Sequence, residues 1–465
     1  MPHTWVDDDD ALARLVARLR DEPAYGLDTE FHRERTYWPR VGLVQLSWPD
    51  GVALVDPLAV DLTALADLLD GPGTMVTHAA DQDLEILERS CGRGPRALFD
   101  TQIAAGFCGL GSPSLGALVE RVLHIRLAKA RRLTDWTRRP LAPDDLDYAA
   151  DDVACLLDLH RELVTRAEAA GRLDWVRDEC EERLHRDRSP QDPDTAWWRL
   201  KGAGSLRGRA RGVAQTVAAW RERRARELDR PPRTVLPDLA LLGVVHRPPR
   251  TREELAAVRG LEGRRLRDDV ARELLEAVTA GLGLPEAELR LPAGERLDRA
   301  LAPAVTLLAA WTGQRAAELG LDAALLATRA DLEALLRGDP DARAARGWRR
   351  ELVAEPARRL LAGELVVALE AGGHRLVLEE RSGPAEREAP PEPPGTPPTH
   401  RDRRPNRPTG AVPAGREPAR PPPRVDLLFG CADVPDAARS SSPERMCGGR
   451  HLFPRQGYTG PTGRR

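Results

Sequence analysis

Residues 24–31 read Ala-Tyr-Gly-Leu-Asp-Thr-Glu-Phe, and this stretch decides the fold of the N-terminal part of the chain. Its apolar first half is typical of a strand that crosses a core, whereas its second half carries Asp28 and Glu30. Residues two apart on a strand face the same side of a sheet. Burying two carboxylates side by side is costly unless a cation pairs with them. The stretch therefore predicts either a metal site on a core strand or a strand end that leaves the core.

The segments around this stretch predict an α/β arrangement, in which a mixed sheet is flanked by helices. Hydrophobic runs and helical spacing predict strands at residues 41–48, 52–55 and 74–78, and helices at residues 8–20, 81–90 and 143–169. A Pro-Asp-Gly turn at residues 49–51 predicts an antiparallel hairpin between two of the strands. Because strand–helix units follow this hairpin, the sheet is expected to be mixed.

Two further acidic motifs lie at predicted helix positions. Asp81 suits the N-cap of its helix, and Asp83 lies on the first turn, from which it can reach a strand end. Tyr148 and Asp152 are four residues apart and therefore share one helix face. Taken singly, an acid at a helix start is usually a cap, and a Tyr/Asp pair usually lies on the surface.

Together, the order and spacing of these motifs are specific. They read Asp-Thr-Glu-Phe from residue 28, His-Ala-x3-Asp from residue 78 and Tyr-x3-Asp from residue 148. Matching stretches also occur at residues 35–46, 99–101, 134–136 and 139–141. On these residues the chain resembles the ribonuclease D family, in the tyrosine subclass of the DEDD 3′–5′ exonucleases. The resemblance implies a ribonuclease H-like 3′–5′ exonuclease domain over residues 1–176.

The resemblance also implies a catalytic set. Carried over by position, the family's metal ligands fall on Asp28, Glu30, Asp83 and Asp152, and its tyrosine falls on Tyr148. Hard oxygen ligands suit two divalent ions, Mg²⁺ or Mn²⁺. One ion would acidify the attacking water, and the other would neutralise the leaving oxygen. Because a free tyrosine has a pKa of about 10, Tyr148 is expected to orient the water rather than to act as a base.

The substrate contacts are less specific. Phe31 and His32 follow the metal strand and could stack on the terminal nucleotide, and His78 could touch its sugar or phosphate. Each of the three is equally well explained as a structural residue. The resemblance favours an exoribonuclease that releases 5′-mononucleotides from RNA 3′ ends, with tRNA precursors or other stable RNA as substrates. The alternatives are a 3′–5′ exonuclease acting on DNA in repair, or an RNA-binding protein with a vestigial nuclease domain.

The second half of the chain is predicted to be helical and to contain a repeat. The length of 465 residues suggests about three domains. The motif Trp-x3-Arg-Ala-x-Glu-Leu begins at Trp220 and again at Trp311. The two modules resemble HRDC domains, which bind nucleic acids, and are expected at residues 196–282 and 296–378 after a linker at residues 177–195. The alternative is a chance likeness between two helices rich in Arg, Ala and Leu.

Basic residues are concentrated at the start of the first module, although the net charge of the chain is −3. Residues 199–233 contain eleven basic side chains against three acids. A basic surface in an otherwise acidic protein is typical of phosphate binding, and the predicted contacts are Lys201, Arg207, Arg209 and Arg211. The alternative is an ordinary solvated helix face, because 68 of the 70 basic residues of this chain are arginines.

The remaining composition bears on compartment and partners. Residues 381–465 are rich in Pro and Arg and are predicted to be a disordered tail. No apolar run approaches the ~18–20 residues of a membrane span, so no membrane partner is expected. The six cysteines form no CxxC pair, and the N-terminus is acidic. These features predict a cytoplasmic protein, and a monomer is favoured.

Overall fold

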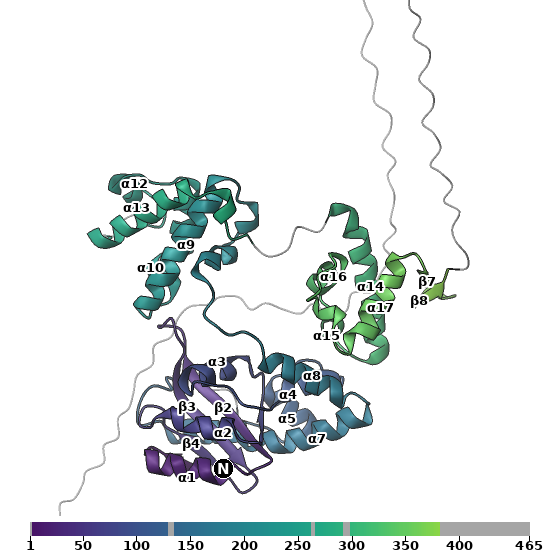
Figure 1. Ribbon diagram of the computed structural model, residues 1–465. Coiled ribbons are helices and arrows are strands. Elements are labelled where there is room, and N and C mark those ends of the chain that lie inside the picture. The colour runs from purple at the N-terminus through teal and green to yellow at the C-terminus, as the bar shows by residue number, and fades with distance from the viewer. Residues whose placement is uncertain (1, 129–133, 262–265, 292–297, 382–465) are drawn as a thin grey trace, which may run out of the picture. The chain divides into compact units, whose positions relative to one another are not determined.

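The computed structural model describes residues 2–128, 134–261, 266–291 and 298–381. The segment predicted to be a disordered tail lies, apart from its first residue, outside the described residues. A central sheet with helices around it forms the N-terminal part, and two helical regions follow along the chain (Figure 1).

The sheet has six strands in the order β1-β4-β3-β2-β5-β6 (Figure 1). The strands are β1 Thr4–Val6, β2 Ala24–His32, β3 Arg40–Trp48, β4 Gly51–Val55, β5 Thr74–Thr77 and β6 Leu98–Asp100. Antiparallel pairs join β2 to β3 and β3 to β4, whereas β1 with β4, β2 with β5 and β5 with β6 are parallel. The predicted mixed sheet and its hairpin are therefore confirmed. Strands β1 and β6 were not predicted, because three residues are too few to show an alternating pattern.

The helices of this part are α1 Asp9–Leu19, α2 Ala66–Leu69, α3 Asp81–Ser90, α4 Thr101–Phe107, α5 Leu115–Leu123, α6 Pro143–Ala154, α7 Leu156–Ala169 and α8 Leu173–Leu184, with a 3₁₀ turn η1 at Leu62–Leu65. The single helix predicted over residues 143–169 is wrong, because the chain breaks at Cys155, which ends α6 and precedes α7. Apolar spacing continues through the break, so periodicity alone could not locate it. The linker predicted from residue 177 also differs, since α8 continues to Leu184 and buries Val176 and Cys180.

Strand pairing places the acidic end of β2 next to the start of α3. Strands β2 and β5 pair only as far as Gly26 and Val76, so Asp28 and Glu30 lie beyond the paired part of β5. Helix α3 begins at Asp81, shortly after β5 ends. The first turn of α3 can therefore approach the free edge of β2.

A bulge in the β2–β3 pair brings a tryptophan to the same end of the sheet. The register shifts between Glu30 and Phe31, which pair with Leu43 and Val41, so Gly42 is the extra residue. A Cβ atom on Gly42 would lie 2.6 Å from Cβ of Trp136. Glycine is therefore required here by the close approach of Trp136, which packs against the bulge.

The first helical region has a core of its own. Its elements are η2 Pro193–Arg199, η3 Ala203–Ser205, α9 Arg209–Glu227, α10 Pro232–Val235, α11 Asp238–His246, α12 Arg252–Ala256, α13 Asp268–Gly283 and η4 Glu286–Glu288. Helices α9 and α13 pack closely in this core (Figure 1), where Trp197, Val213 and Leu274 are buried.

The second helical region ends in strands. It contains η5 Arg299–Leu301, α14 Ala302–Leu319, α15 Ala323–Leu326, α16 Arg329–Leu336, η6 Arg343–Ala345, a π-helical turn η7 at Arg350–Ala354, α17 Glu355–Leu361, β7 Leu365–Leu369 and β8 Leu376–Glu380. The prediction of helix to about residue 378 is wrong, because β7 and β8 form an antiparallel pair. Gly372 and Gly373 have φ of 108° and 76° in the intervening turn, a conformation that ends a helix and suits a tight turn. The interpretation of residues 296–378 as a second HRDC-like domain stays a prediction.

Membrane-spanning helices and cysteine pairing can be examined in the described residues. Within them, no helix is both long and apolar enough to cross a membrane. The four cysteines that the structure describes, Cys91, Cys108, Cys155 and Cys180, are all free thiols.

Candidate functional site

Three of the four predicted metal ligands lie together. Asp28 and Glu30 project from β2 and Asp152 from α6, and one carboxylate oxygen of each lies within 4.8 Å of the others. Asp83, on the first turn of α3, is not a member of this tight group, but its charge acts strongly on Asp28. The structure therefore brings three carboxylates to one point and places the fourth beside them.

Asp83 is held by hydroxyl groups. The Thr29 hydroxyl donates a hydrogen bond to Asp83 Oδ1 over 2.6 Å, and the Thr77 hydroxyl lies 3.5 Å from Asp83 Oδ2. Both threonines are buried, as is Asp83 itself. Sequence reasoning did not identify Thr29, although it stands inside the Asp-Thr-Glu motif. Nothing along the chain indicates that its hydroxyl bonds to a residue on α3.

The four carboxylates are strained electrostatically. Burial, followed by the charges of Asp83, Glu30 and Asp152, raises the pKa of Asp28 well above its usual value. Burial is also the main cause that raises the pKa of Glu30 to about 8, of Asp83 to about 7 and of Asp152 to about 6. In the described part of the chain, no arginine or lysine forms an ion pair with any of the four.

This donor set fits divalent cations. Buried carboxylates that lack a protein cation are costly, and bound metal ions remove the cost. Carboxylate oxygens are hard ligands of the kind that Mg²⁺ and Mn²⁺ prefer. The group of Asp28, Glu30 and Asp152, with Asp83 beside it, is therefore the candidate metal site.

Tyr148 lies next to this group on helix α6, one turn before Asp152. Burial, and then the charge of Asp152 and a hydrogen bond to it, raise the pKa of the Tyr148 hydroxyl above its usual value. The ring lies 6.2 Å from the Trp136 ring, measured between centroids, with an angle of 30° between the planes. Tyr148 is therefore protonated at neutral pH and is held as a hydrogen-bond donor at the edge of the site.

A cleft of about 610 Å³ opens beside the carboxylates. Its lining includes Glu30 and Tyr148 from the catalytic set, together with Phe31, His32, Gln82, Trp136, Thr36, Thr134, Thr137, Asp135, Glu34 and the arginines Arg33, Arg35 and Arg40. His32 Nε2 lies 2.9 Å from Asp135 Oδ1. Asp135 also accepts hydrogen bonds from the Thr137 hydroxyl and backbone N–H. Sequence reasoning assigned no role to Asp135 or to the three arginines.

His78 differs from the other predicted substrate contacts. Its Nδ1 lies 2.9 Å from the Thr101 hydroxyl and its Nε2 lies 3.1 Å from the Pro113 carbonyl oxygen. It does not line the cleft. Burial lowers its pKa, against the opposing charge of Asp100. The structure therefore gives His78 a place in a partly buried hydrogen-bond network outside this cleft, and substrate contact by Phe31, His32 and His78 stays a prediction.

Asp81, next to the metal site in sequence, is used differently from Asp83. It forms ion pairs with Arg183, at 2.6 Å, and with Arg186, at 3.4 Å. The prediction that Asp81 is the N-cap of its helix is wrong, because α3 has Ala80 in that position and no side-chain cap. The ion pairs occupy its carboxylate instead.

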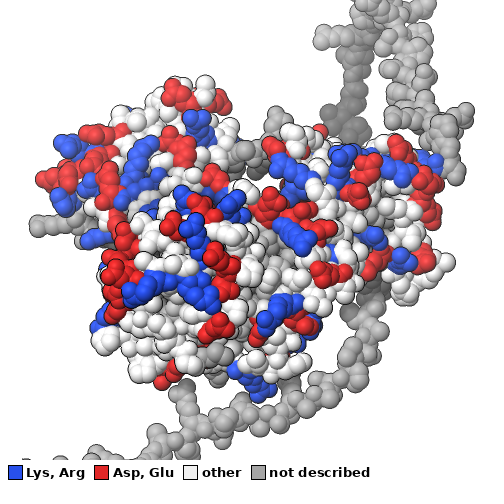
Figure 2. All heavy atoms as spheres, turned by 60° about the horizontal axis from the view of Figure 1, so that its bottom comes forward, with Lys and Arg blue, Asp and Glu red and all other residues white. Residues whose placement is uncertain are grey.

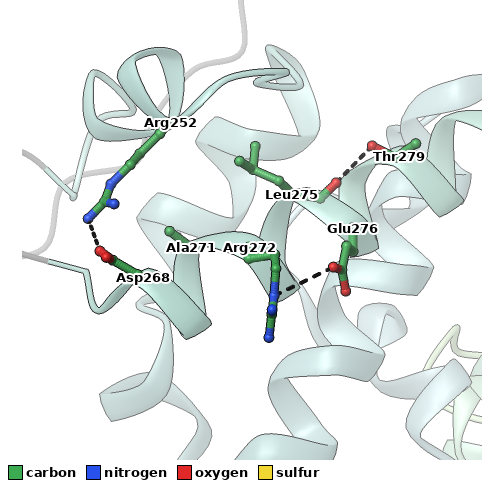
Figure 3. A pocket seen from close by; sticks show the side chains of 7 residues that line it. All are labelled: Arg252, Asp268, Ala271, Arg272, Leu275, Glu276 and Thr279. Atoms are coloured by element: carbon green, nitrogen blue, oxygen red, sulfur yellow. Dashed lines mark hydrogen bonds and ion pairs between the residues drawn. The ribbon is translucent and has the colours of Figure 1, made fainter.

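Another hollow lies in the first helical region, between α12 and α13 (Figure 3). Its charged groups pair with one another, Arg252 with Asp268 at 2.5 Å and Arg272 with Glu276 at 3.7 Å. Acidic and basic side chains are likewise interspersed over the face of the molecule drawn in Figure 2. This hollow therefore offers a ligand no uncompensated charge.

The predicted nucleic-acid contacts differ from the charged residues of this hollow, which form ion pairs with one another. Among the described residues, Lys201, Arg207, Arg209 and Arg211 form no ion pair. Five arginines further along the same region have acidic partners: Arg221 and Arg233 pair with Asp238, Arg223 with Asp194, Arg224 with Glu227, and Arg226 with Glu222. The start of α9 and the residues just before it therefore carry positive charge that is not paired with any acid in the described part of the chain.

Comparison with known proteins gives consistent matches. A family model described as 3′–5′ exonuclease matches residues 3–168, and a model of the HRDC domain matches residues 210–278. Ribonuclease D of Gluconacetobacter diazotrophicus is 38% identical over 365 residues, 77% of this chain and 93% of the relative. Ribonuclease D of Nitrobacter hamburgensis is 38% identical over 376 residues, 80% of this chain and 98% of the relative. RNase D of Escherichia coli, an exoribonuclease involved in structured RNA processing, has a crystal structure that matches with a TM-score of 0.72 and 35% identity, covering 78% of this chain and 99% of that one.

Proposed function

The chain belongs to the ribonuclease D family of 3′–5′ exoribonucleases, and from this premise we propose that it removes 5′-mononucleotides from RNA 3′ ends by a two-metal-ion mechanism. The observation that carries the proposal is the half-buried group of Asp28, Glu30 and Asp152, which has no cationic partner among the described residues. Two bound divalent ions would supply an activated water and would neutralise charge on the scissile phosphate and leaving oxygen.

The protein's own groups perform the positioning. Asp28 and Glu30 on β2 and Asp152 on α6 fix the point at which the phosphate is held, since a rigid sheet and a packed helix carry them. The Tyr148 hydroxyl, protonated and oriented by its hydrogen bond to Asp152, accepts a hydrogen bond from the attacking water through its oxygen and so aligns the water. Its raised pKa argues against a role as general base.

The cleft beside Glu30 would hold the last nucleotides of the substrate. Phe31 offers an aromatic face and His32 a ring nitrogen, whereas Arg35 and Arg40 supply positive charge for backbone phosphates and Arg33 is paired with Glu85. His32 is oriented by Asp135. These features suit a single strand that enters with its 3′ end toward the carboxylates.

The substrate is proposed to be a structured RNA, with 3′ trimming of tRNA precursors as the biological role. The E. coli relative is an exoribonuclease involved in structured RNA processing. The uncompensated charges of Lys201, Arg207, Arg209 and Arg211 suit contact with the body of such a substrate. All five positions of the catalytic set are present, which speaks against a vestigial nuclease.

The test compares 5′-labelled RNA and DNA of the same sequence, each with a free or a blocked 3′ end, in Mg²⁺, Mn²⁺ or EDTA. We expect stepwise shortening of RNA from a free 3′ end, and none in EDTA. Asp28→Asn and Asp152→Asn should abolish turnover while RNA binding persists, and Tyr148→Phe should leave a small residual rate. Asp81→Asn is the matched control, because this acid lies beside the site but pairs with arginines. Faster degradation of the DNA, or cleavage by Asp28→Asn, would contradict the proposal.

A further inference from the structure

Thr29 stands between two metal ligands without being one. It lies on β2 between Asp28 and Glu30, and strand geometry directs its side chain to the opposite face from theirs. The side chain is buried, and its hydroxyl donates to Asp83 Oδ1 over 2.6 Å. The same strand therefore presents two ligands directly and fixes a third group from the neighbouring helix.

Among the described side chains, the Thr29 hydroxyl makes the shortest hydrogen bond to Asp83, and the Thr29 backbone N–H also acts on this carboxylate. Only 5% of Asp83 is exposed, and its other hydroxyl neighbour, Thr77, is 3.5 Å away, at the limit of a hydrogen bond. Within the described residues it has no arginine or lysine partner. Asp83 also lies on the first turn of α3. The β2–β5 pairing ends at Gly26 and Val76, before this turn, so strand pairing does not hold the turn against β2.

The chemistry of the donor matters as much as its position. A hydroxyl satisfies one carboxylate oxygen but adds no positive charge, so the other oxygen stays available to a cation. An arginine in the same place would compete with that cation, as Arg183 and Arg186 neutralise the adjacent Asp81. Hydrogen bonds to ligating carboxylates orient them, and losing one typically lowers metal affinity by about 10–100-fold.

We propose that Thr29 is a positioning residue whose hydroxyl holds Asp83 as a ligand of the second cation, outside the tight group formed by Asp28, Glu30 and Asp152. The inference rests on the proposed two-metal function. It predicts that the binding affinities of the two cations depend differently on Thr29. The cation held by the tight group does not need the Thr29 hydroxyl, whereas the cation that binds Asp83 does.

The test measures Mn²⁺ binding to the RNA-free protein, by calorimetry and by the electron paramagnetic resonance signal of free Mn²⁺. Two pairs of variants isolate the hydroxyl: Thr29→Val against the wild type, which have similar shape, and Thr29→Ala against Thr29→Ser. We expect two sites in the wild type and in Thr29→Ser. In Thr29→Val and Thr29→Ala, one site should keep its affinity, and the other should weaken by about 10–100-fold.

Thr216→Val is the matched control, because the Thr216 hydroxyl donates over 2.7 Å to the Ala277 carbonyl, in the first helical region. Its Mn²⁺ binding should equal that of the wild type. Unchanged affinities in both Thr29→Val and Thr29→Ala, or equal weakening in Thr29→Ser and Thr29→Ala, would overturn the inference while leaving the proposed function intact. A wild type that binds no Mn²⁺ would overturn both. Thermal unfolding in EDTA identifies folded variants, and the Ala/Ser pair decides if Thr29→Val does not fold.

Discussion

The two helical regions carry the same sequence motif, but their buried apolar residues belong to different cores. In the first region, residues such as Val213, Leu241 and Leu274 form a separate hydrophobic cluster. In the second, Leu308, Leu326 and Val353 belong to the same cluster as the residues of the six-stranded sheet. The region that carries the first copy of the motif thus has a core of its own. The region that carries the second copy extends the core of the exonuclease domain.

The contacts of the second region explain the difference. The Trp348 ring stacks on Trp175 of α8, with centroids 4.8 Å apart and 14° between planes, and meets Phe107 of α4 edge-on at 5.3 Å. Arg172 donates to the carbonyl of Leu319 over 2.6 Å. In the first region, Trp220, whose counterpart in the repeat is Trp311, donates a hydrogen bond to Glu273 of its own region over 3.0 Å. The second region is therefore packed against the exonuclease domain, whereas the first has a separate hydrophobic cluster and meets that domain through polar contacts such as the Tyr37 hydroxyl with Glu222.

The largest effect is expected from removing each region in turn. A chain ending at residue 291 should lose the cooperative unfolding of its sheet, because Phe107 and Trp175 would be exposed. A chain in which a Gly/Ser linker replaces residues 196–290 should keep that transition. Differential scanning calorimetry and circular dichroism distinguish the two. Equal destabilisation by the two deletions would contradict the comparison.

A smaller but still large effect is expected at the ion pair between Glu179 of α8 and Arg349 of the second region, which are 13% and 3% exposed. Glu179→Gln should lower the free energy of unfolding by about 3–5 kcal/mol, because it leaves a buried guanidinium without its charge partner. Arg177→Gln, at an exposed pair on the same helix, should cost under about 1 kcal/mol. Denaturant titration measures both.

The Glu179 carboxylate also makes the free energy of unfolding depend on pH. Burial opposes its ionisation, but the hydrogen bond and charge of Arg349 and the charge of Arg343 outweigh this and lower the pKa of Glu179. A depressed pKa in the folded state contributes stability above the unfolded value of about 4.3, and this is lost as the pH falls through the folded pKa. Glu179→Gln should therefore remove part of the acid sensitivity seen below about pH 4.3.

An intermediate effect is expected in the separate core of the first region. A Cβ on Gly281 of α13 would lie 2.4 Å from the Thr216 hydroxyl and 2.6 Å from the Val213 Cα of α9. Gly281→Ala should destabilise this region by about 1–3 kcal/mol and leave the transition of the sheet unchanged. Gly283→Ala, on the same helix with open space around it, is the control and should be neutral or stabilising. Hydrogen exchange resolves the two regions, and faster exchange in the sheet of Gly281→Ala than in that of the wild type would count against separate cores.

The smallest effect concerns RNA affinity. Arg207→Gln with Arg209→Gln should weaken RNA binding and reduce the slope of log K against log salt by up to about 0.7 per charge, as for phosphate contacts to a single strand. The control, Arg223→Gln with Arg233→Gln, removes two arginines that have acidic partners and should change the slope little. Fluorescence anisotropy at several salt concentrations measures both. Equal slopes for the two double variants would place the RNA elsewhere.

Much of the catalytic strand was predictable because its signals are local. Alternation placed Asp28 and Glu30 on one face of β2, and i,i+4 spacing placed Tyr148 and Asp152 on one face of α6. The turn residues 49–51 adjoin the two strands that they connect, and the residues that start α3 lie within a few positions of Asp83. The break at Cys155 and the hairpin β7–β8 were not predicted, because apolar spacing is compatible with more than one local structure.

By itself, the sequence determined the longer elements of the sheet, the repeated motif and the identity of the groups that can bind a cation. Only the tertiary structure decided that Thr29 bonds to Asp83, that His78 bonds to Thr101, and that the second helical region shares the core of the sheet. The physical reason is the range of the interactions. Periodicity and turn chemistry act between neighbours in the chain, whereas the partner of a buried polar group and the surface that a helix covers depend on residues far away in sequence.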